Sequence, residues 1–237
     1  MSKQEVLNTA DHQELRVIRK RSAELGDNTM CAQLMPREFR DAQNDYPIFF
    51  HKDSDSEQFL PYAMFGFEQN ENLFVRGENW DAAYLPFLVE KGPFMIGLQE
   101  KPNNERGRVI TIDVEHPRVS RTEGEPLFLP QGGNSKYLER ISFLLNAIDE
   151  GVRETGEFVD ALLEFDLLEP FKLDIELNNG ARYALENFHT INEDRLLALE
   201  GDALAKLSAK QYLAAAYMVV ASLSNIRKLI ARKNHRL

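Results

Sequence analysis

The spacing of apolar residues changes near the middle of the chain, from short β-type segments to long helical ones. In the first half, short segments rich in aromatic and β-branched residues are separated by polar turns, which is typical of antiparallel strands. The predicted strands are residues 46–51, 59–67, 72–76, 94–98 and 109–113. We also expect short helices over residues 36–44, with Pro36 in the first turn, and over residues 80–85.

The second half begins with the three- and four-residue apolar spacing of an amphipathic helix over residues 135–167. Gly151 and Gly156 favour either a bend or a break within this helix, and Pro170 ends it. The sequence therefore predicts one long helix that leads into a new element near residue 171.

Residues 171–188 alternate between apolar and polar side chains around Asn178-Asn179-Gly180, which predicts a β-hairpin. A two-residue loop would place Tyr183 opposite Glu176 and break the apolar face. A three-residue loop keeps that face intact, because it pairs Leu177 with Ala181, Ile175 with Tyr183 and Leu173 with Leu185. We therefore predict the three-residue loop, with Gly180 at a positive φ.

Two capping boxes follow the hairpin, one from Thr190 to Glu193 and one from Ser208 to Gln211. The first predicts a short helix that continues through Leu199. The second predicts the start of a last long helix, which is apolar at first and becomes basic and exposed after about residue 226.

These patterns indicate the α+β class, with a largely antiparallel sheet in the N-terminal half and a helical C-terminal half that contains an inserted β-hairpin. The predicted segments are an N-terminal arm (1–35), a β-rich half (36–115), a linker or long loop (116–134) and a helical half (135–237). We expect one interlocked domain rather than two independent ones.

The chain has 28 Lys and Arg residues against 38 Asp and Glu residues, a formal net charge of −10. A field of that sign repels phosphate backbones and argues against nucleic-acid binding. Near the C-terminus, Arg227, Lys228, Arg232 and Lys233 predict one of two arrangements. They form either a solvated helix end or a contact surface for a protein or peptide partner, or for acidic surfaces such as anionic lipids.

Cys31 is the only cysteine, so no intrachain disulfide can form. The N-terminal segment lacks the apolar core of a signal peptide. The longest apolar run, residues 213–220, is about half of the ~20 residues that a membrane span needs. We therefore expect a cytoplasmic protein without a transmembrane segment, although export by a non-classical route stays open.

The sequence contains no phosphate-binding glycine loop and neither the nucleophile-elbow nor the zinc-protease motif. His51 and Asp53 have the spacing of two ligands in a facial iron triad, with His116 or His189 as the third. A solvated turn explains the same residues more simply. We therefore predict no cofactor, metal or catalytic residue, and we keep a metal site at His51, Asp53 and His116 as the alternative.

Aromatic residues are dense between residues 49 and 94. Most of them are expected in the core, because aromatic side chains dominate the buried area of such sheets. The alternative is a groove in which Trp80 and Tyr84, four apart on one predicted helix, lie beside Glu71, Asn72 and Asp81. Such a groove would bind a peptide strand or a small aromatic ligand.

Several motifs occur in a specific order along the chain. They are Tyr46-Pro47-Ile48-Phe49-Phe50, Glu71-Asn72-Leu73-Phe74-Val75, Trp80-Asp81-Ala82, Leu168-Glu169-Pro170, Phe188-His189-Thr190-Ile191-Asn192 and Ser222-Leu223-Ser224-Asn225-Ile226. In order and spacing they resemble the SapC family, and the resemblance covers roughly residues 12–230.

The resemblance implies a bacterial protein of a family named after a surface-layer locus, whose members are often encoded near TonB-dependent receptors. It implies no catalytic residues. We therefore expect a non-enzymatic accessory protein that binds a protein, peptide or small ligand for a surface-layer or TonB-dependent uptake system. The alternatives are a metal-dependent, oxygenase-like enzyme and a structural subunit of a surface assembly.

Overall fold

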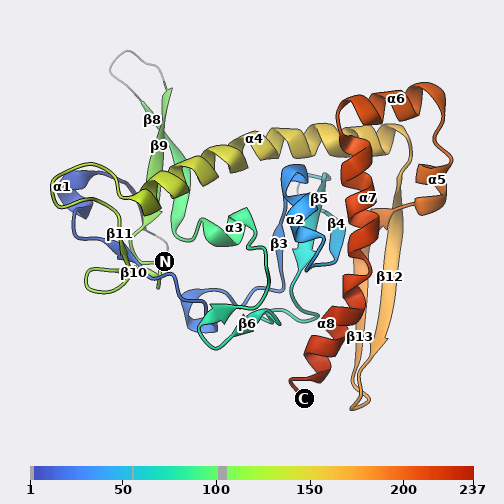
Figure 1. Cartoon of the computed structure of the whole chain (residues 1–237), viewed down its shortest axis with the longest axis horizontal. Helices are drawn as coiled ribbons and strands as arrows, with labels where there is room; N and C mark the ends of the chain where they lie inside the picture. Colours follow the sequence, from blue (N-terminus) through green and yellow to red (C-terminus); the bar gives the residue numbers. More distant parts are fainter. Residues whose placement is uncertain (1–2, 55, 101–105) are drawn as a thin grey trace.

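A computed structural model describes residues 3–54, 56–100 and 106–237 and confirms the α+β class, because every strand pairing in it is antiparallel. Helix α4 (Lys136–Glu164) runs along one side of the molecule and connects its two ends (Figure 1). Its first half packs on small sheets formed near the N-terminus, and its second half packs on a five-stranded sheet.

Helix α4 starts at the N-cap Ser135, whose hydroxyl accepts a hydrogen bond from the backbone N–H of Leu138. Gly151 and Gly156 do not break α4, which is one uninterrupted helix of 29 residues, and the bend stays a prediction. A Cβ on Gly151 would lie 2.3 Å from Cγ of the buried Met35. Gly151 therefore serves close packing against Met35, and it does not interrupt the helix.

Two hydrophobic clusters lie along α4. Near its start, Leu138, Ile141 and Leu144 pack with Phe94 and Ile112. Near its end, Phe158, Val159 and Leu162 belong to a larger cluster that fills the space around the five-stranded sheet. Because α4 contributes residues to both clusters, the two ends of the molecule pack against the same helix. The predicted boundary at residues 116–134 stays a prediction.

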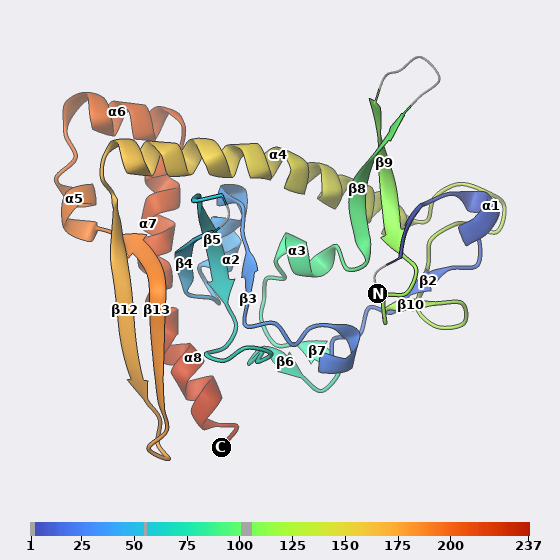
Figure 2. The same ribbon diagram turned by 180° about the vertical axis from the view of Figure 1, so that it is seen from behind.

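The five-stranded sheet has the order β12-β13-β4-β5-β3 and is seen best from behind (Figure 2). Its strands are β3 (Cys31–Gln33), β4 (Ile48–Lys52), β5 (Phe59–Met64), β12 (Leu168–Glu176) and β13 (Arg182–Ile191). Strand β13 pairs with β4 through only two residue pairs, so the hairpin β12–β13 diverges from the rest of the sheet.

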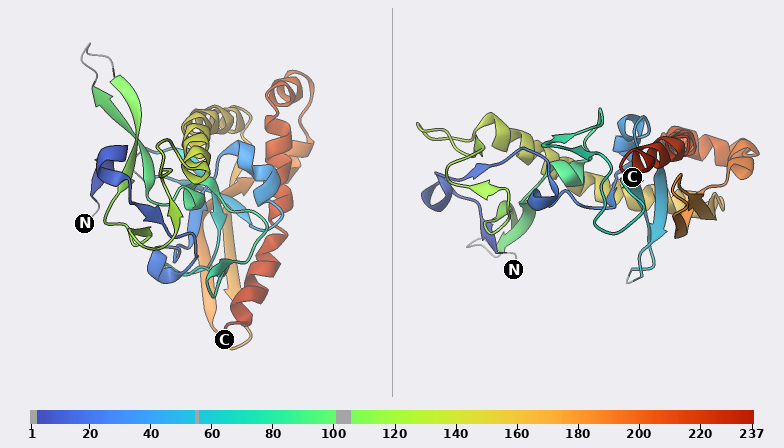
Figure 3. Two further views of the ribbon diagram at one scale, coloured as in Figure 1. Left: turned by 60° about the vertical axis from the view of Figure 1, so that its left-hand side comes forward. Right: turned by 90° about the horizontal axis from the view of Figure 1, so that it is seen from below.

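Helix α7 (Tyr212–Ser222) contacts both β13 and β4 where these strands separate. There the Ser222 hydroxyl accepts a hydrogen bond from the backbone N–H of Ile48 at 2.9 Å. Helices α7 and α8 (Asn225–Asn234) form a rod beside the hairpin (Figure 3). This rod supplies the cover for the apolar side of the hairpin.

The hairpin register is the one predicted. Leu173 pairs with Leu185, Ile175 pairs with Tyr183, and the N–H of Leu177 donates to the carbonyl of Ala181. Gly180 has φ +83°, as the three-residue loop requires. The alternation of side chains was a sufficient guide, because a slip by one residue would have exposed the buried Ile175 and Leu185.

The N-terminal segment and the remaining strands form smaller sheets, so the β-rich half is not one sheet. One has the order β1-β9-β8, another β10-β2-β11, and the third is the pair β6-β7. Their strands are β1 (Gln4–Val6), β2 (Arg16–Val17), β6 (Val75–Arg76), β7 (Asn79–Trp80), β8 (Phe94–Glu100), β9 (Arg106–Asp113), β10 (Val119–Ser120) and β11 (Glu125–Pro126). The two strands before β3 therefore contribute to two separate sheets.

Short helical segments connect these sheets. They are α1 (Thr9–His12), a 3₁₀ turn (Ala23–Leu25), a second 3₁₀ turn (Pro36–Glu38) continued by α2 (Phe39–Ala42), and α3 (Phe87–Glu90). The predicted helix with Pro36 in its first turn is confirmed. The predicted helix over residues 80–85 is wrong, because Trp80 pairs with Val75 in the hairpin β6–β7 and helix α3 starts only after Pro86.

The C-terminal helices differ from the prediction at their starts. Helix α5 (Glu193–Leu197) is capped by Asn192 and not by Thr190, because β13 continues through Ile191. An additional helix α6 (Gly201–Ala209) contains Ser208 in its last turn, so the second capping box is also wrong. Helix α7 follows it at Tyr212.

One helical stretch among the described residues, Tyr212–Asn234, is long and apolar enough to cross a membrane by length and composition alone. A core helix passes the same test. In this structure Ala216, Val219 and Leu229 of the stretch are buried in the larger hydrophobic cluster.

Candidate functional site

The two sets of residues that the sequence singled out for ligand and partner binding face each other. Lys233 of α8 forms ion pairs with Glu71 and Glu68, with Nζ 2.5 Å from an oxygen of each. At the preceding position of α8, Arg232 NH1 lies 2.8 Å from the Asp81 carboxylate. The structure therefore joins Glu71 and Asp81 to Lys233 and Arg232, where we had expected two separate sites.

Lys233 is an internal residue, with 7% of its surface exposed. Burial by itself lowers the pKa of its ammonium group, but the hydrogen bonds and charges of Glu68 and Glu71 outweigh burial and raise that pKa. Lys233 is therefore charged at neutral pH and holds the 66–72 loop against α8. Because these charges are already paired with one another, they position the loop and contribute little to the binding of a partner.

Asn72 is also buried and acts within the loop. Its Nδ2 donates to the carbonyl of Asp27 at 2.8 Å, and its Oδ1 accepts from the N–H of Phe74 at 2.9 Å. Glu71 accepts from the N–H of Phe67 at 2.9 Å. These hydrogen bonds satisfy the polar groups inside the loop, so Glu71 and Asn72 stabilise the loop conformation.

The aromatic residues around Trp80 pack against one another. The indole of Trp80 stacks on Phe74, with interplanar angle 17°, and meets Phe65 edge-on at 5.1 Å between ring centroids. The guanidinium of Arg232 lies 4.4 Å from the centroid of the Phe74 ring. The indole N–H donates to the hydroxyl of Tyr46 at 2.7 Å. Trp80 is thus fixed from several sides.

Tyr84 lies apart from Trp80 and is held by Glu38. Its hydroxyl donates to Glu38 Oε1 at 2.8 Å, and the same oxygen accepts the N–H of Phe87 at 2.9 Å. Burial raises the pKa of the Glu38 carboxyl, and burial together with this carboxylate raises the pKa of the Tyr84 hydroxyl. The ligand-binding role of these side chains stays a prediction, and their helix-face geometry is wrong.

A groove of about 740 Å³ lies on the other side of the Asp81–Arg232 pair, between α8 and the hairpin β6–β7. Its lining residues are Leu73, Val75, Arg76, Gly77, Asp81, Lys228, Ala231, Arg232, His235 and Arg236. Four of these are Arg or Lys and one is Asp. Val75 and Ala231 add apolar surface.

The positive charge of the groove is only partly neutralised. Among the described residues, the Asp81–Arg232 pair is the ion pair formed within the lining. The guanidinium of Arg236 donates to the carbonyls of Asn72 and Val75. These hydrogen bonds fix its position but do not neutralise its positive charge. Arg76 and Lys228 are exposed, and no carboxylate of the described chain forms an ion pair with either. The groove can therefore attract an acidic group.

The site residues predicted from the sequence do not include Arg76, His235 and Arg236. Part of the signal was present, because Lys228, Arg232 and Arg236 recur at the four-residue spacing of one helix face. In the structure α8 ends at Asn234, and Arg236 lies in the turn that follows. Arg227, which was included, is exposed and does not line the groove. Arg76 could be found only from the fold.

The structure does not gather the residues of the alternative metal site. Within residues 3–54, 56–100 and 106–237, no group of three or more His, Cys, Asp and Glu side chains could hold a metal ion. His51 lies on β4, where its ring meets Phe188 edge-on, whereas His116 follows β9 and accepts the N–H of Arg118. We derive no metal chemistry from these residues.

A protein-family model described as SapC matches residues 7–229 of the chain. No curated protein and no solved structure gives a significant match.

Proposed function

The chain belongs to the SapC family, and from this premise we propose that it is a non-enzymatic accessory protein that binds an acidic segment of a partner protein in the groove beside α8. In this proposal it works in the cytoplasm and serves a surface-layer or TonB-dependent uptake system.

The observation that carries the proposal is the unbalanced charge of the groove. The chain as a whole has a net charge of −10, yet this groove has four Arg and Lys side chains against one Asp. A local positive field on an acidic protein favours a negatively charged partner and speeds its encounter. The exposed Arg76 and Lys228 are the groups best placed to form new ion pairs.

The residues that line the groove favour a peptide that has apolar side chains between its acidic ones. Val75 and Ala231 contribute apolar surface, while Arg236 is held in place by two backbone carbonyls. A guanidinium that is already positioned loses less conformational entropy when it binds a carboxylate. The groove thus combines preorganised charge with some apolar contact.

The test uses fluorescence anisotropy with a short, fluorescein-labelled peptide in which Asp and Leu alternate. We expect saturable binding that weakens with rising salt, because the interaction is electrostatic. The double variant Arg76→Glu and Lys228→Glu should weaken binding about tenfold or more. A peptide with Asn in place of Asp should not bind.

The matched control carries the same charge change away from the groove. Lys172→Glu and Arg182→Glu reverse two exposed charges on the outer side of the hairpin β12–β13. This control should leave the affinity close to that of the unmodified chain. Absence of saturable binding by the unmodified chain, or equal weakening in the control, would contradict the proposal.

A further inference from the structure

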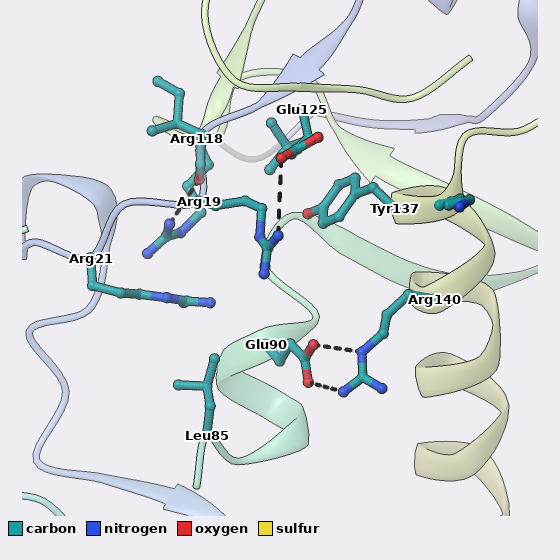
Figure 4. A pocket seen from close by; sticks show the side chains of 12 residues that line it. Arg19, Arg21, Leu85, Glu90, Arg118, Glu125, Tyr137 and Arg140 are labelled. Atoms are coloured by element: carbon teal, nitrogen blue, oxygen red, sulfur yellow. Dashed lines mark hydrogen bonds and ion pairs between the residues drawn. The ribbon is translucent and has the colours of Figure 1, made fainter. Parts of the chain in front are cut away.

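A second cavity lies at the opposite end of the molecule, between β2, α3 and the first turn of α4 (Figure 4). Its volume is about 360 Å³, which is within the range of small-molecule sites. The lining residues are Val17, Ile18, Arg19, Arg21, Leu85, Glu90, Gly92, Arg118, Glu125, Lys136, Tyr137 and Arg140. Five of these residues are cationic and two are carboxylates. The cavity is therefore basic, although the chain as a whole has a net charge of −10.

The innermost cation is a fixed part of the wall. Arg118 is 3% exposed and pairs with Asp27, which is 4% exposed. It also donates to the carbonyls of Ile18 and Lys20. Arg118 therefore keeps its position whatever the cavity contains, and Asp27 balances one of the five positive charges.

Arg140 is likewise engaged. Its guanidinium donates two hydrogen bonds of 2.9 Å to the two oxygens of Glu90. This pair neutralises one cation and one carboxylate. It also shows that a carboxylate meets a guanidinium edge-on at this cavity, which is the two-bond geometry that arginine favours.

Besides the exposed Lys136, three further donors point into the same space (Figure 4). Arg19 is exposed and lies 4.0 Å from Glu125, too far for a hydrogen bond. Arg21 uses NH1 for Asp27 and for the carbonyl of Val89, which leaves its other nitrogens available. The hydroxyl of Tyr137 has no hydrogen-bond partner among the described residues, and burial raises its pKa to about 12, so it stays a donor at neutral pH.

We infer that this cavity binds a small organic carboxylate, whose oxygens are held by Arg19, Arg21 and the hydroxyl of Tyr137. The carbon skeleton of the ligand lies against Ile18 and Leu85. Inorganic phosphate has no carbon skeleton to lie against this apolar surface, so we expect the cavity to prefer an organic carboxylate. None of these residues lines the groove of the proposed function, so the two proposals stand or fall separately.

The test is an NMR titration of the full chain with benzoate and 3-phenylpropionate at constant ionic strength. We expect saturable shifts of backbone signals around Tyr137 and Arg19. Benzamide, which has the same ring and no charge, should bind about tenfold more weakly or not at all. Inorganic phosphate should also bind more weakly.

Substitutions at the proposed hydrogen-bond donors test their contribution to carboxylate binding. Arg19→Gln and Tyr137→Phe together should weaken benzoate binding about tenfold or more, and Arg19→Lys should have a smaller effect because it keeps the charge and loses the fork. Arg121→Gln removes an equally exposed arginine that pairs only with Glu14, and it should not change the affinity. Thermal unfolding of each variant checks the fold.

The inference is overturned if neither carboxylate gives saturable shifts. It is also overturned if benzamide or phosphate binds as tightly as benzoate, or if Arg121→Gln weakens binding as much as the variants of the cavity.

Discussion

The indole N–H of Trp80 donates a hydrogen bond of 2.7 Å to the hydroxyl of Tyr46, and the same hydroxyl donates to the carbonyl of Tyr84. Tyr46 is fully buried at the start of the five-stranded sheet. One hydroxyl thus links the hairpin β6–β7 and the segment before α3 to the core of the molecule.

Removal of this hydroxyl should leave the indole N–H and the Tyr84 carbonyl without their partner. We expect Tyr46→Phe to lower the free energy of unfolding by about 1–3 kcal/mol, measured by urea denaturation. Tyr217→Phe is the control, since Tyr217 is 42% exposed and makes no hydrogen bond among the described side chains. An equal effect of both substitutions would show that the Tyr46 hydroxyl has no special role.

The two glycines of α4 should respond in opposite directions to alanine. Gly151→Ala places a methyl group against the buried Met35 and should destabilise the fold by about 1–3 kcal/mol. Gly156→Ala meets no atom within 4 Å and should stabilise it by up to about 1 kcal/mol, because alanine favours the helix. Thermal and urea unfolding of both variants provide the measurement, and a stable Gly151→Ala variant would contradict the packing argument.

The buried ion pair of Arg118 and Asp27 should be far more sensitive than an exposed one. Asp27→Asn leaves Arg118 buried without a counter-charge and should cost about 3–5 kcal/mol of unfolding free energy. Glu176→Gln, which removes the exposed partner of Arg182, should change stability by less than about 1 kcal/mol. Similar losses for the two variants would mean that Asp27 does not compensate Arg118.

Protonation of His116 should make the fold less stable in mild acid. Burial, together with the charge of Arg118, lowers the pKa of His116 from its ordinary value of 6.5, so the folded chain binds this proton less readily than the unfolded chain does. Stability from this source is complete above pH 6.5 and falls as the pH drops through and below that value.

The measurement is the urea midpoint between neutral pH and about pH 5.5, a window in which histidines are the side chains that titrate. His116→Asn should flatten the decline, since an asparagine oxygen can still accept the N–H of Arg118. The same substitution at the exposed His235 is the control. An unchanged slope in His116→Asn would assign the decline to other groups.

Local patterns predicted much of the fold, and long-range contacts account for most of what they missed. The hairpin register followed from side-chain alternation and Gly180, both of which lie within one segment. The Trp80 segment looked helical by composition, yet Phe74 and Tyr46 fix Trp80 in a strand. Thr190 resembled a helix cap only because the continuation of β13 through Ile191 could not be read locally.

The candidate site was harder to predict than the fold. Glu71 and Lys233 are 162 residues apart, and no local pattern indicates that they pair. Burial of charged groups is also absent from the sequence, so Lys233 looked like a surface residue. The basic face of α8 was visible as a pattern, whereas the groove beside it depends on where the hairpin β6–β7 lies.

The bond between Ile48 and Ser222 has a consequence for biosynthesis. During translation, β4 leaves the ribosome long before the residue that satisfies its backbone N–H, because 174 positions separate the two. Until Ser222 and the rest of α7 have been made, the backbone N–H of Ile48 lacks its partner and the aromatic side chains of β4 lack their final cover. Nascent chains should therefore depend on chaperones late in synthesis.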